Sequence, residues 1–413
     1  MRIVSGRSAE TAVQRLASRG VSLARVEAPV RRIVRDVQRK GDGALRRYAK
    51  RWDALAPRQS LRLSESEIAA ALSGIHKGLR DALRVAARNI RRFCERQMPK
   101  EWTINRAGAS TGVLIRPLQS VGCYVPGGRY PLMSTLLMTV IPAQVAGVKR
   151  IVVVSPRPSQ EVLAAAAMLG VREFYSAGGA HAIAALAYGT KSIARVDKIV
   201  GPGNAYVTAA KKLVAFDCAI DFLAGPTEAL VWSDSGNPKF IAADLVAQAE
   251  HDPDAVAALI TTSRSLARAV AAEVADIAES NQIARQSLRR QGVILLASSQ
   301  TKACDWANRI APEHITVDQE NLRHIKNAGS IFIGDYSAQA AGDYASGPNH
   351  VLPTAGQARF RGGLSVMDFV KIVTVQQLSA QAMRRLAPTL ECLAEAEGLT
   401  AHAESIRVRC GHA

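Results

Sequence analysis

The sequence predicts an α/β protein with two Rossmann-like parallel-sheet domains of related design, N-terminal helices and a C-terminal helical tail. After residues 113–115, short β-branched runs alternate with Ala-rich segments of helical length, and the same alternation returns in the second half of the chain. Strands that alternate with helices form parallel sheets through right-handed crossovers. The chain has 413 residues, of which 48% are hydrophobic and 21% charged, so it is long enough for two domains with ample cores.

The N-terminal section is predicted to be helical. Its first apolar stripe at helical spacing comprises Val30, Ile33, Val34 and Val37. The glycines of residues 40–43 end that helix, and Ser64 with Glu67 forms a capping-box pattern that starts another. The second stripe comprises Ile68, Leu72, Ile75, Leu79 and Leu83. Stripes of this kind indicate packing rather than a cofactor site.

Short apolar runs rich in β-branched residues predict the strands. In the first half they are residues 151–154, 174–176 and 197–200, and in the second half residues 229–232, 256–261, 293–297 and 331–333. A helix over residues 161–169, closed by Gly170, separates the first two strands.

Four segments follow from this pattern. Residues 1–115 are expected to complete the first α/β domain, residues 116–225 to form the second, and residues 226–362 to form the main part of the first. Residues 363–413 form the helical tail. Hinges are expected around Gly225 and Pro226 and in the segment before Val121.

The chain is expected to be cytoplasmic, with no membrane partner. Its first ten residues contain no apolar run typical of a signal peptide, and residues 136–148, the most apolar stretch, are interrupted by Thr139, Pro142 and Gln144. Six cysteines occur without a C-x-x-C pair, which argues against a disulfide framework and against a thiolate metal site. A metal would therefore need nitrogen and oxygen ligands.

The net charge of +18 raises the question of a nucleic-acid partner. Residues 1–100 hold 24 Lys and Arg against 9 Asp and Glu, so fifteen of the eighteen net charges lie there. They are spaced through amphipathic helices, with no basic block and few aromatic residues between them. Solvated helix faces explain this distribution better than a nucleic-acid partner. Steeply salt-dependent affinity for duplex or single strands would contradict that interpretation.

An apolar helical face turns polar within residues 241–254. Ile241 and Leu245 start the face, and Gln248 and His251 continue it three residues apart. An amide oxygen and an imidazole at this spacing can converge on one ligand. A buried, hydrogen-bonded polar pair is the alternative for an isolated Q-x-x-H pattern.

Glycine clusters follow several predicted strands, at residues 124–128, 178–180 and 201–204. Glycine permits close approach of a ligand, and helix N-termini attract phosphate. None of the clusters is a dinucleotide fingerprint. Gly201 and Gly203 lack the third glycine of that motif, so tight-turn chemistry explains them equally well.

Three further polar clusters lie late in the chain. Glu313 and His314 are adjacent between a helix and a strand, where a carboxyl group and an imidazole could transfer protons. Residues 341–354 contain Asp343 and His350 in a glycine-rich loop, and Glu397 and His402 flank Gly398. His, Asp and Gln ligands suit Zn²⁺ best, with Mn²⁺ or Co²⁺ as alternatives.

Several ordered motifs resemble the histidinol dehydrogenase family over most of the chain. They are Y-V-P-G-G from Tyr124, V-D-K-I-V-G-P-G-N-A-Y-V from Val196, A-G-P-T-E from Ala224, D-L-V-A-Q-A-E-H from Asp244, P-E-H from Pro312, G-D-Y-A-S-G-P-N-H-V-L-P-T from Gly342, G-L-S-V-M-D-F from Gly363 and E-G-L-T-A-H from Glu397. The resemblance implies oxidation of L-histidinol to L-histidine through an enzyme-held aldehyde, with two NAD⁺ in sequence, in the last steps of histidine biosynthesis.

The resemblance also implies a role for each site residue. One Zn²⁺ per subunit would be held by Gln248, His251, Asp343 and His402. His314 would accept the alcohol proton, and Glu313 would activate the water that attacks the aldehyde. The substrate contacts would be Thr227, Gln248, His251, His314, Asp343, His350, Glu397 and His402, and the NAD⁺ contacts Tyr124, His181 and Asn204.

Two positions depart from the family pattern. His181 stands where the family usually has glutamine at a cofactor contact, and Thr227 replaces the common serine while keeping the hydroxyl. By the same resemblance, the tail brings Glu397 and His402 to the metal of another subunit, which implies a homodimer with shared active sites. The alternative is a dehydrogenase of the same family that oxidises another alcohol, amino alcohol or polyol, because fold alone does not settle substrate.

Overall fold

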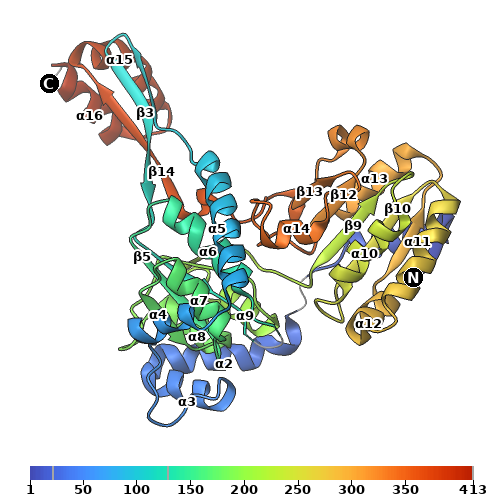
Figure 1. The fold of residues 1–413 in the computed structure, drawn as a ribbon. Coiled ribbons are helices and arrows are strands. Elements are labelled where there is room, and N and C mark those ends of the chain that lie inside the picture. The colour runs from blue at the N-terminus through green and yellow to red at the C-terminus, as the bar shows by residue number, and fades with distance from the viewer. Residues whose placement is uncertain (21–22, 128–129, 412–413) are drawn as a thin grey trace. The chain divides into compact units, whose positions relative to one another are not determined.

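The computed structural model describes residues 1–20, 23–127 and 130–411, which form two compact units (Figure 1). The first unit comprises Met1–Gln97 and Gln119–Phe369, and the second comprises Met98–Leu118 and Val370–Ala413. No helix in the described ranges is long and apolar enough to cross a membrane.

Sheet A of the first unit is a parallel sheet of six strands in the order β1-β11-β10-β9-β12-β13. Their bounds are β1 (Arg2–Ser5), β9 (Glu228–Trp232), β10 (Val256–Thr261), β11 (Val293–Leu296), β12 (His314–Val317) and β13 (Ser330–Ile333). The chain runs from β9 outward through β10 and β11, and later returns to the other side of β9 with β12. The two central strands, β9 and β12, are therefore neighbours although 81 residues separate their ends.

Helices cover both faces of sheet A because its strands are apolar on both sides. On one face Leu230 and Ile260 pack with α1 (Gly6–Ala17) and α13 (Gln300–Ile310). On the other, Val231 and Leu259 pack with α10 (Pro238–Ala249), α11 (Arg264–Ile277) and α12 (Gln282–Arg290). Figure 1 shows α10, α11 and α12 together in yellow and amber beside β9 and β10.

Sheet B of the first unit is a parallel sheet of five strands in the order β6-β5-β4-β7-β8. Their bounds are β4 (Ser120–Tyr124), β5 (Arg150–Ser155), β6 (Glu173–Ser176), β7 (Lys198–Val200) and β8 (Ala219–Ile220). The helices that connect them are α6 (Met133–Val145), α7 (Gln160–Met168), α8 (Gly179–Tyr188) and α9 (Ala205–Val214). The two parallel sheets confirm the predicted fold class.

The N-terminal helices are divided between the two sheets. β1 and α1 extend and cover sheet A, whereas α2 (Ala24–Lys40) packs on α8 and α9 beside sheet B, and α3 (Asp42–Trp52) packs on α8. Of residues 1–115, expected to complete the first α/β domain, β1 and α1 join sheet A, α2 and α3 lie beside sheet B, and residues 98–115 belong to the second unit. An apolar stripe shows that a helix is covered, but not which sheet covers it.

The helix predicted from Ser64 begins as expected, with the capping box of Ser64 and Glu67 confirmed. It ends earlier than its apolar stripe, because Gly74 separates α4 (Glu65–Ser73) from α5 (Lys77–Gln97). These two helices pack on α7 and α6, respectively, on the side of sheet B away from α2. The short elements late in the first unit are α14 (Gln339–Tyr344), η1 (Gln319–His324), η2 (Gln357–Arg359) and η3 (Val366–Phe369).

The second unit is a three-stranded antiparallel sheet with two helices. The strand order is β14-β3-β2, from β2 (Trp102–Arg106), β3 (Ala109–Pro117) and β14 (Val370–Leu378), followed by α15 (Ala380–Ala396) and α16 (Thr400–Cys410). The tail expected to be helical over residues 363–413 thus contains a strand, β14, before its two long helices. Residues 370–375, V-K-I-V-T-V, are rich in β-branched residues, which favours a strand there.

Candidate active site

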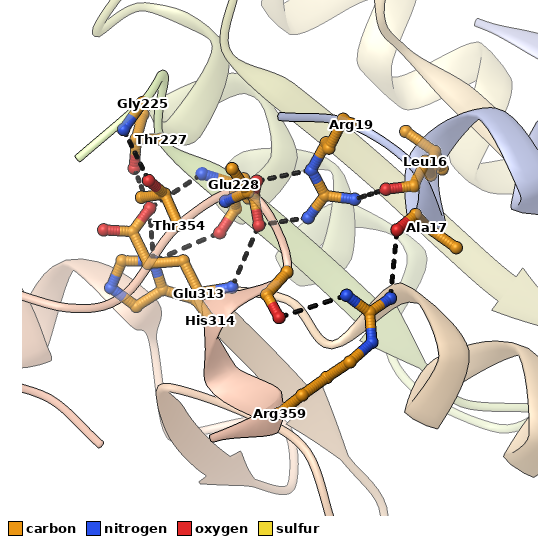
Figure 2. A network of polar contacts seen from close by, with 12 residues as sticks. Leu16, Ala17, Arg19, Gly225, Thr227, Glu228, Glu313, His314, Thr354 and Arg359 are labelled. Carbon is orange, nitrogen blue, oxygen red and sulfur yellow. Dashed lines mark hydrogen bonds and ion pairs between the residues drawn. The ribbon is translucent and has the colours of Figure 1, made fainter. Parts of the chain in front are cut away.

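Polar side chains gather at the amino ends of β9 and β12 (Figure 2). β9 begins at Glu228 and β12 at His314, and the two strands pair in parallel with His314 opposite Ala229. Because parallel neighbours start at the same edge of a sheet, Thr227 and Glu228 lie beside Glu313 and His314. Two segments 85 residues apart therefore form one cluster.

The carboxyl group of Glu313 is buried and held by two donors. The hydroxyl of Thr227 donates to its Oε2 over 2.5 Å, and the backbone N–H of Glu228 donates to the same oxygen over 2.8 Å. The amide of Gln248 donates in turn to the Thr227 oxygen. Burial raises the pKa of Glu313 well above its ordinary value, and the nearby carboxylates of Glu228 and Asp343 act in the same direction. A carboxyl group of this kind can accept and release protons nearer neutral pH.

The imidazole of His314 is buried and orientated by the backbone. Its Nδ1 lies 3.3 Å from the carbonyl oxygen of Glu228, which can only accept, so Nδ1 carries the proton and Nε2 is the free acceptor. Nε2 lies 3.9 Å from a carboxylate oxygen of Asp343. Burial lowers the pKa of His314, with Asp343 opposing that effect. The ring is thus suited to accept a proton at Nε2.

Asp343 and His350 lie on the other side of His314. Within the described ranges the Asp343 carboxylate accepts no hydrogen bond from an N–H or O–H group, and burial raises its pKa. His350 donates from Nδ1 to the Asp343 backbone oxygen over 2.7 Å, and its Nε2 lies 3.4 Å from the hydroxyl of Thr135 on α6. Burial lowers the pKa of His350 to about 4, so its ring is neutral at pH 7.

Gln248 and His251 were predicted to lie on one face of a single helix, and this prediction holds only for Gln248. Gln248 lies in the last turn of α10 and is buried, but α10 ends at Ala249, and His251 lies two residues beyond it. A backbone hydrogen bond of 3.4 Å from the His251 N–H to the backbone carbonyl oxygen of Gln248 continues the turn. α10 contacts α14, which carries Asp343.

These residues offer the donor types that a zinc ion uses. Within the described part of the chain, neither the side-chain oxygen of Gln248 nor the carboxylate of Asp343 accepts a hydrogen bond. An unengaged amide oxygen and an unengaged carboxylate near an imidazole fit a divalent cation. Over residues 1–20, 23–127 and 130–411, no three His, Cys, Asp or Glu side chains form a metal-holding group.

Glu397 and His402 belong to the second unit. Glu397 directly follows α15, Gly398 takes a left-handed conformation with φ of 74°, and α16 carries His402 in its first turn. Their place beside the other predicted ligands stays a prediction.

The predicted cofactor residues lie at the carboxyl edge of sheet B. The strand order reverses between β4 and β7, and ligands of open α/β sheets bind outside the carboxyl ends of the strands at such a point. Tyr124 ends β4, and residues 201–204 follow β7. Gly201 has φ of 113°, and a Cβ there would lie 2.2 Å from the Tyr124 backbone oxygen, so only glycine fits. Asn204 caps α9 by accepting from Tyr206 and Val207 N–H.

His181 is committed to a buried partner. Its Nε2 lies 2.7 Å from Asp53 Oδ2, which also accepts the N–H of Gly178, and its ring lies 5.8 Å from that of Trp52. Its Nδ1 is buried and has no hydrogen-bond partner in the described ranges. The neighbouring Tyr124 hydroxyl accepts the N–H of Gly179 over 3.1 Å. A contact between His181 and the cofactor stays a prediction. It would have to use Nδ1, because Nε2 is bound to Asp53.

A cavity of about 300 Å³ opens beside this edge, after β4 and β5. Its polar lining residues are Tyr130, Ser155, Arg157, Ser159 and Glu161. They did not emerge from sequence patterns, although Ser155 directly follows the predicted strand at residues 151–154 and Arg157 lies two residues further on. Glu228, the last residue of A-G-P-T-E, was also missed as a site residue.

Two parallel sheets, one with a buried Glu–His pair at its edge and one with glycine loops at its carboxyl edge, are the arrangement expected of an NAD-dependent oxidoreductase. The family model described as histidinol dehydrogenase matches residues 16–410. The chain belongs to the histidinol dehydrogenase family.

Individual relatives agree with this assignment. The chain is 49% identical to a histidinol dehydrogenase of Methanothermobacter thermautotrophicus, over 93% of each chain. It is 46% identical to one of Agrobacterium fabrum, over 93% of this chain and 92% of the relative. The crystal structure of histidinol dehydrogenase from Elizabethkingia anophelis superposes with a TM-score of 0.94 at 36% identity, covering 99% of this chain and 98% of that one.

Proposed function

We propose that this protein oxidises L-histidinol to L-histidine through histidinal, transferring two hydrides in succession to NAD⁺, in the last steps of histidine biosynthesis. The observation that carries the proposal is the buried pair of Glu313 and His314, whose pKa values are shifted in opposite directions at one edge of sheet A. Two oxidation steps with different proton demands need two such groups.

In the alcohol step His314 accepts the hydroxyl proton. Hydride leaves the alcohol carbon only when that proton is accepted, and Nε2 of His314 is the free acceptor because Nδ1 donates to Glu228. The lowered pKa keeps the ring neutral before the step. The proton on Nε2 is then stabilised by Asp343, 3.9 Å away.

In the aldehyde step Glu313 activates the attacking water. Addition of water gives a hydrate, from which the second hydride leaves. The pKa of Glu313 is raised by burial, which makes its carboxylate a stronger base than an exposed one. The donors Thr227 and Glu228 both bind Oε2, so Oε1 remains available to a water molecule.

Gln248, His251 and Asp343 of one subunit, with His402 of the partner subunit, would hold one Zn²⁺. The unengaged oxygens of Gln248 and Asp343 support this assignment. The ion supplies a fixed positive charge that orients the amine and imidazole of the substrate. His350, Thr227 and Glu397 are the further substrate contacts, and the neutral ring of His350 offers Nε2 to a donor on the substrate.

NAD⁺ would bind at the carboxyl edge of sheet B, with Tyr124, His181 and Asn204 as contacts. The reversal of strand order between β4 and β7 and the tight approach of Gly201 to Tyr124 support this position. The cavity after β5 is suited to the adenosine end of the cofactor.

The homodimer is supported by the apolar surface of the second unit. Large apolar side chains of this small unit are more than half exposed, namely Trp102, Ile104, Ile372, Leu393 and Val408 at 52, 59, 53, 58 and 54%. Such a density of exposed apolar groups is typical of a surface covered by another chain. A second copy as the covering chain would place two units of this kind in one dimer.

The proposed reaction is tested by following NAD⁺ reduction with L-histidinol and with a panel of other alcohols, amino alcohols and polyols. We expect two NAD⁺ reduced per histidinol and a kcat/KM for histidinol at least about a hundredfold above that for alcohols lacking the imidazole, because a site built for polar groups rejects analogues without them. A higher kcat/KM for another alcohol would favour the alternative substrate.

Chelation is expected to abolish turnover, and added Zn²⁺ to restore it, because the ion is proposed to orient the amine and the imidazole of the substrate. Activity and zinc content are measured together, and Asp343→Asn should lower the zinc content. Full activity after exhaustive chelation, with absence of metal verified by elemental analysis, contradicts the metal assignment.

The two proton roles are separated by substitution. Glu313→Gln should lower the rate of histidinal oxidation by about 10²- to 10⁴-fold, the usual worth of a general base, whereas His314→Ala should lower histidinol oxidation at least as much. Both half-reactions are measured for each variant by single-turnover NADH formation. Equal and slight effects of both substitutions on both half-reactions would show the roles to be misassigned.

Shared active sites are tested by mixing His314→Ala subunits with His402→Ala subunits. A hybrid dimer would contain one site with both histidines, so random reassortment of equal amounts should restore about a quarter of wild-type activity. Mixing His314→Ala with Glu313→Ala is the matched control and should restore none, because both changes lie on the same side of the site. If hybrids form and activity does not return, each site is built within one chain.

A further inference from the structure

Glu228 contacts both predicted catalytic residues and uses three of its own groups to do so. Its backbone N–H donates to Glu313 Oε2 over 2.8 Å, and its backbone carbonyl accepts from His314 Nδ1 over 3.3 Å. Its side-chain carboxylate accepts the backbone N–H of Glu313 over 3.2 Å. The positions of both catalytic side chains therefore depend on one neighbouring residue.

The carboxylate of Glu228 is itself buried, with 2% of the residue exposed, and Arg19 holds it with two parallel hydrogen bonds (Figure 2). The backbone N–H of Ala355 donates to the same carboxylate over 2.7 Å. A buried carboxylate needs both a cation and hydrogen-bond donors, and a guanidinium with two donors in one plane supplies the best-matched geometry.

Arg19 is fixed in turn by the chain around it. Its Nη1 donates to the Leu16 carbonyl at the end of α1, and Arg359 donates to the next carbonyl, Ala17, over 3.0 Å. Arg359 also donates to the Arg309 carbonyl at the end of α13. The end of α1 is thereby connected to the segment that leads to Glu313, although Arg19 precedes every motif that identifies the family.

We propose that Arg19 and Glu228 form a positioning pair, in which Glu228 orients Glu313 and His314 and the charge of Arg19 offsets the negative charge of Glu228 beside Glu313. Neither residue reaches the reacting atoms. The inference rests on the proposed function, because it assigns the pair to the step in which Glu313 acts as a base.

The charges around Glu313 give this pair a measurable signature. The groups that face Glu313 are the carboxylates of Glu228 and Asp343 and the ring of His314, with Arg19 behind Glu228. Negative charge on Glu228 raises the pKa of Glu313. Without Arg19 the charge of Glu228 is no longer neutralised, so the pKa of Glu313 rises further. Without the charge of Glu228 the pKa of Glu313 falls. A general base acts only when it is deprotonated. The acidic limb of the pH–rate profile for histidinal oxidation therefore moves with the pKa of Glu313.

The experiment measures kcat against pH for histidinal oxidation in the zinc-loaded enzyme. Arg19→Gln should move the acidic limb to higher pH by about one pH unit, and Glu228→Gln should move it to lower pH by a similar amount. The double variant, which again has no net charge at the pair, should return close to the wild-type limb. A merely structural role would lower stability in all three variants without shifts of opposite sign.

Arg150→Gln is the matched control. Arg150 holds Glu173 with two hydrogen bonds of 2.8 and 2.9 Å, in a half-buried pair at the start of β5 and β6, remote from the carboxyl edge of sheet B. The acidic limb of the pH profile of Arg150→Gln should stay at the same pH as that of the wild-type enzyme. Thermal unfolding of every variant reports the loss of stability separately, and if Arg19→Gln does not fold, the downward shift of Glu228→Gln decides.

Limbs that do not move, or that move in the same direction in both single variants, overturn the proposal. Failure of the proposed function is distinct from this result, because wild-type enzyme would then not oxidise histidinal at all.

Discussion

The site depends on the parallel pairing of β9 with β12. This register places His314 opposite Ala229, and it brings the amino end of one central strand to the amino end of the other. Without it Thr227 and Glu228 would have no contact with Glu313, because 85 residues separate Glu228 from Glu313. Sheet A is apolar on both faces and covered by helices, so the register is set by burial of its strands rather than by the polar residues at its edge.

Burial shifts the pKa values of the two proposed catalytic groups, Glu313 and His314. The same transfer out of water raises the pKa of Glu313 and lowers that of His314, because it disfavours the charged form of each. Glu228 is as deeply buried but is neutralised by Arg19. The two carboxyl groups therefore differ in their proposed roles. Glu228 has the cation of Arg19 as its partner, whereas Glu313 has only hydrogen-bond donors.

The two sheets use opposite edges. The proposed NAD⁺ contacts lie at the carboxyl edge of sheet B, where strand order reverses, as ligand sites of open α/β sheets usually do. The proposed proton-transfer pair, Glu313 and His314, lies at the amino edge of sheet A. The two sheets are thus proposed to serve different parts of the reaction, and the fold class alone gives no guide to the edge that holds Glu313.

The sequence by itself determined local features such as the capping box at Ser64 and the strands β5, β6, β7, β9, β10, β11 and β13, because these depend on neighbouring residues. It did not indicate β1, β2 or β14, and the roles of Glu313 and His314, chosen through family motifs, are proposals. Only the tertiary structure decided that α10 ends before His251, that α2 covers sheet B, and that Arg19 reaches Glu228. These outcomes depend on contacts between residues far apart in the chain. A buried charge must find its partner in space, and sequence spacing contains no record of that partner.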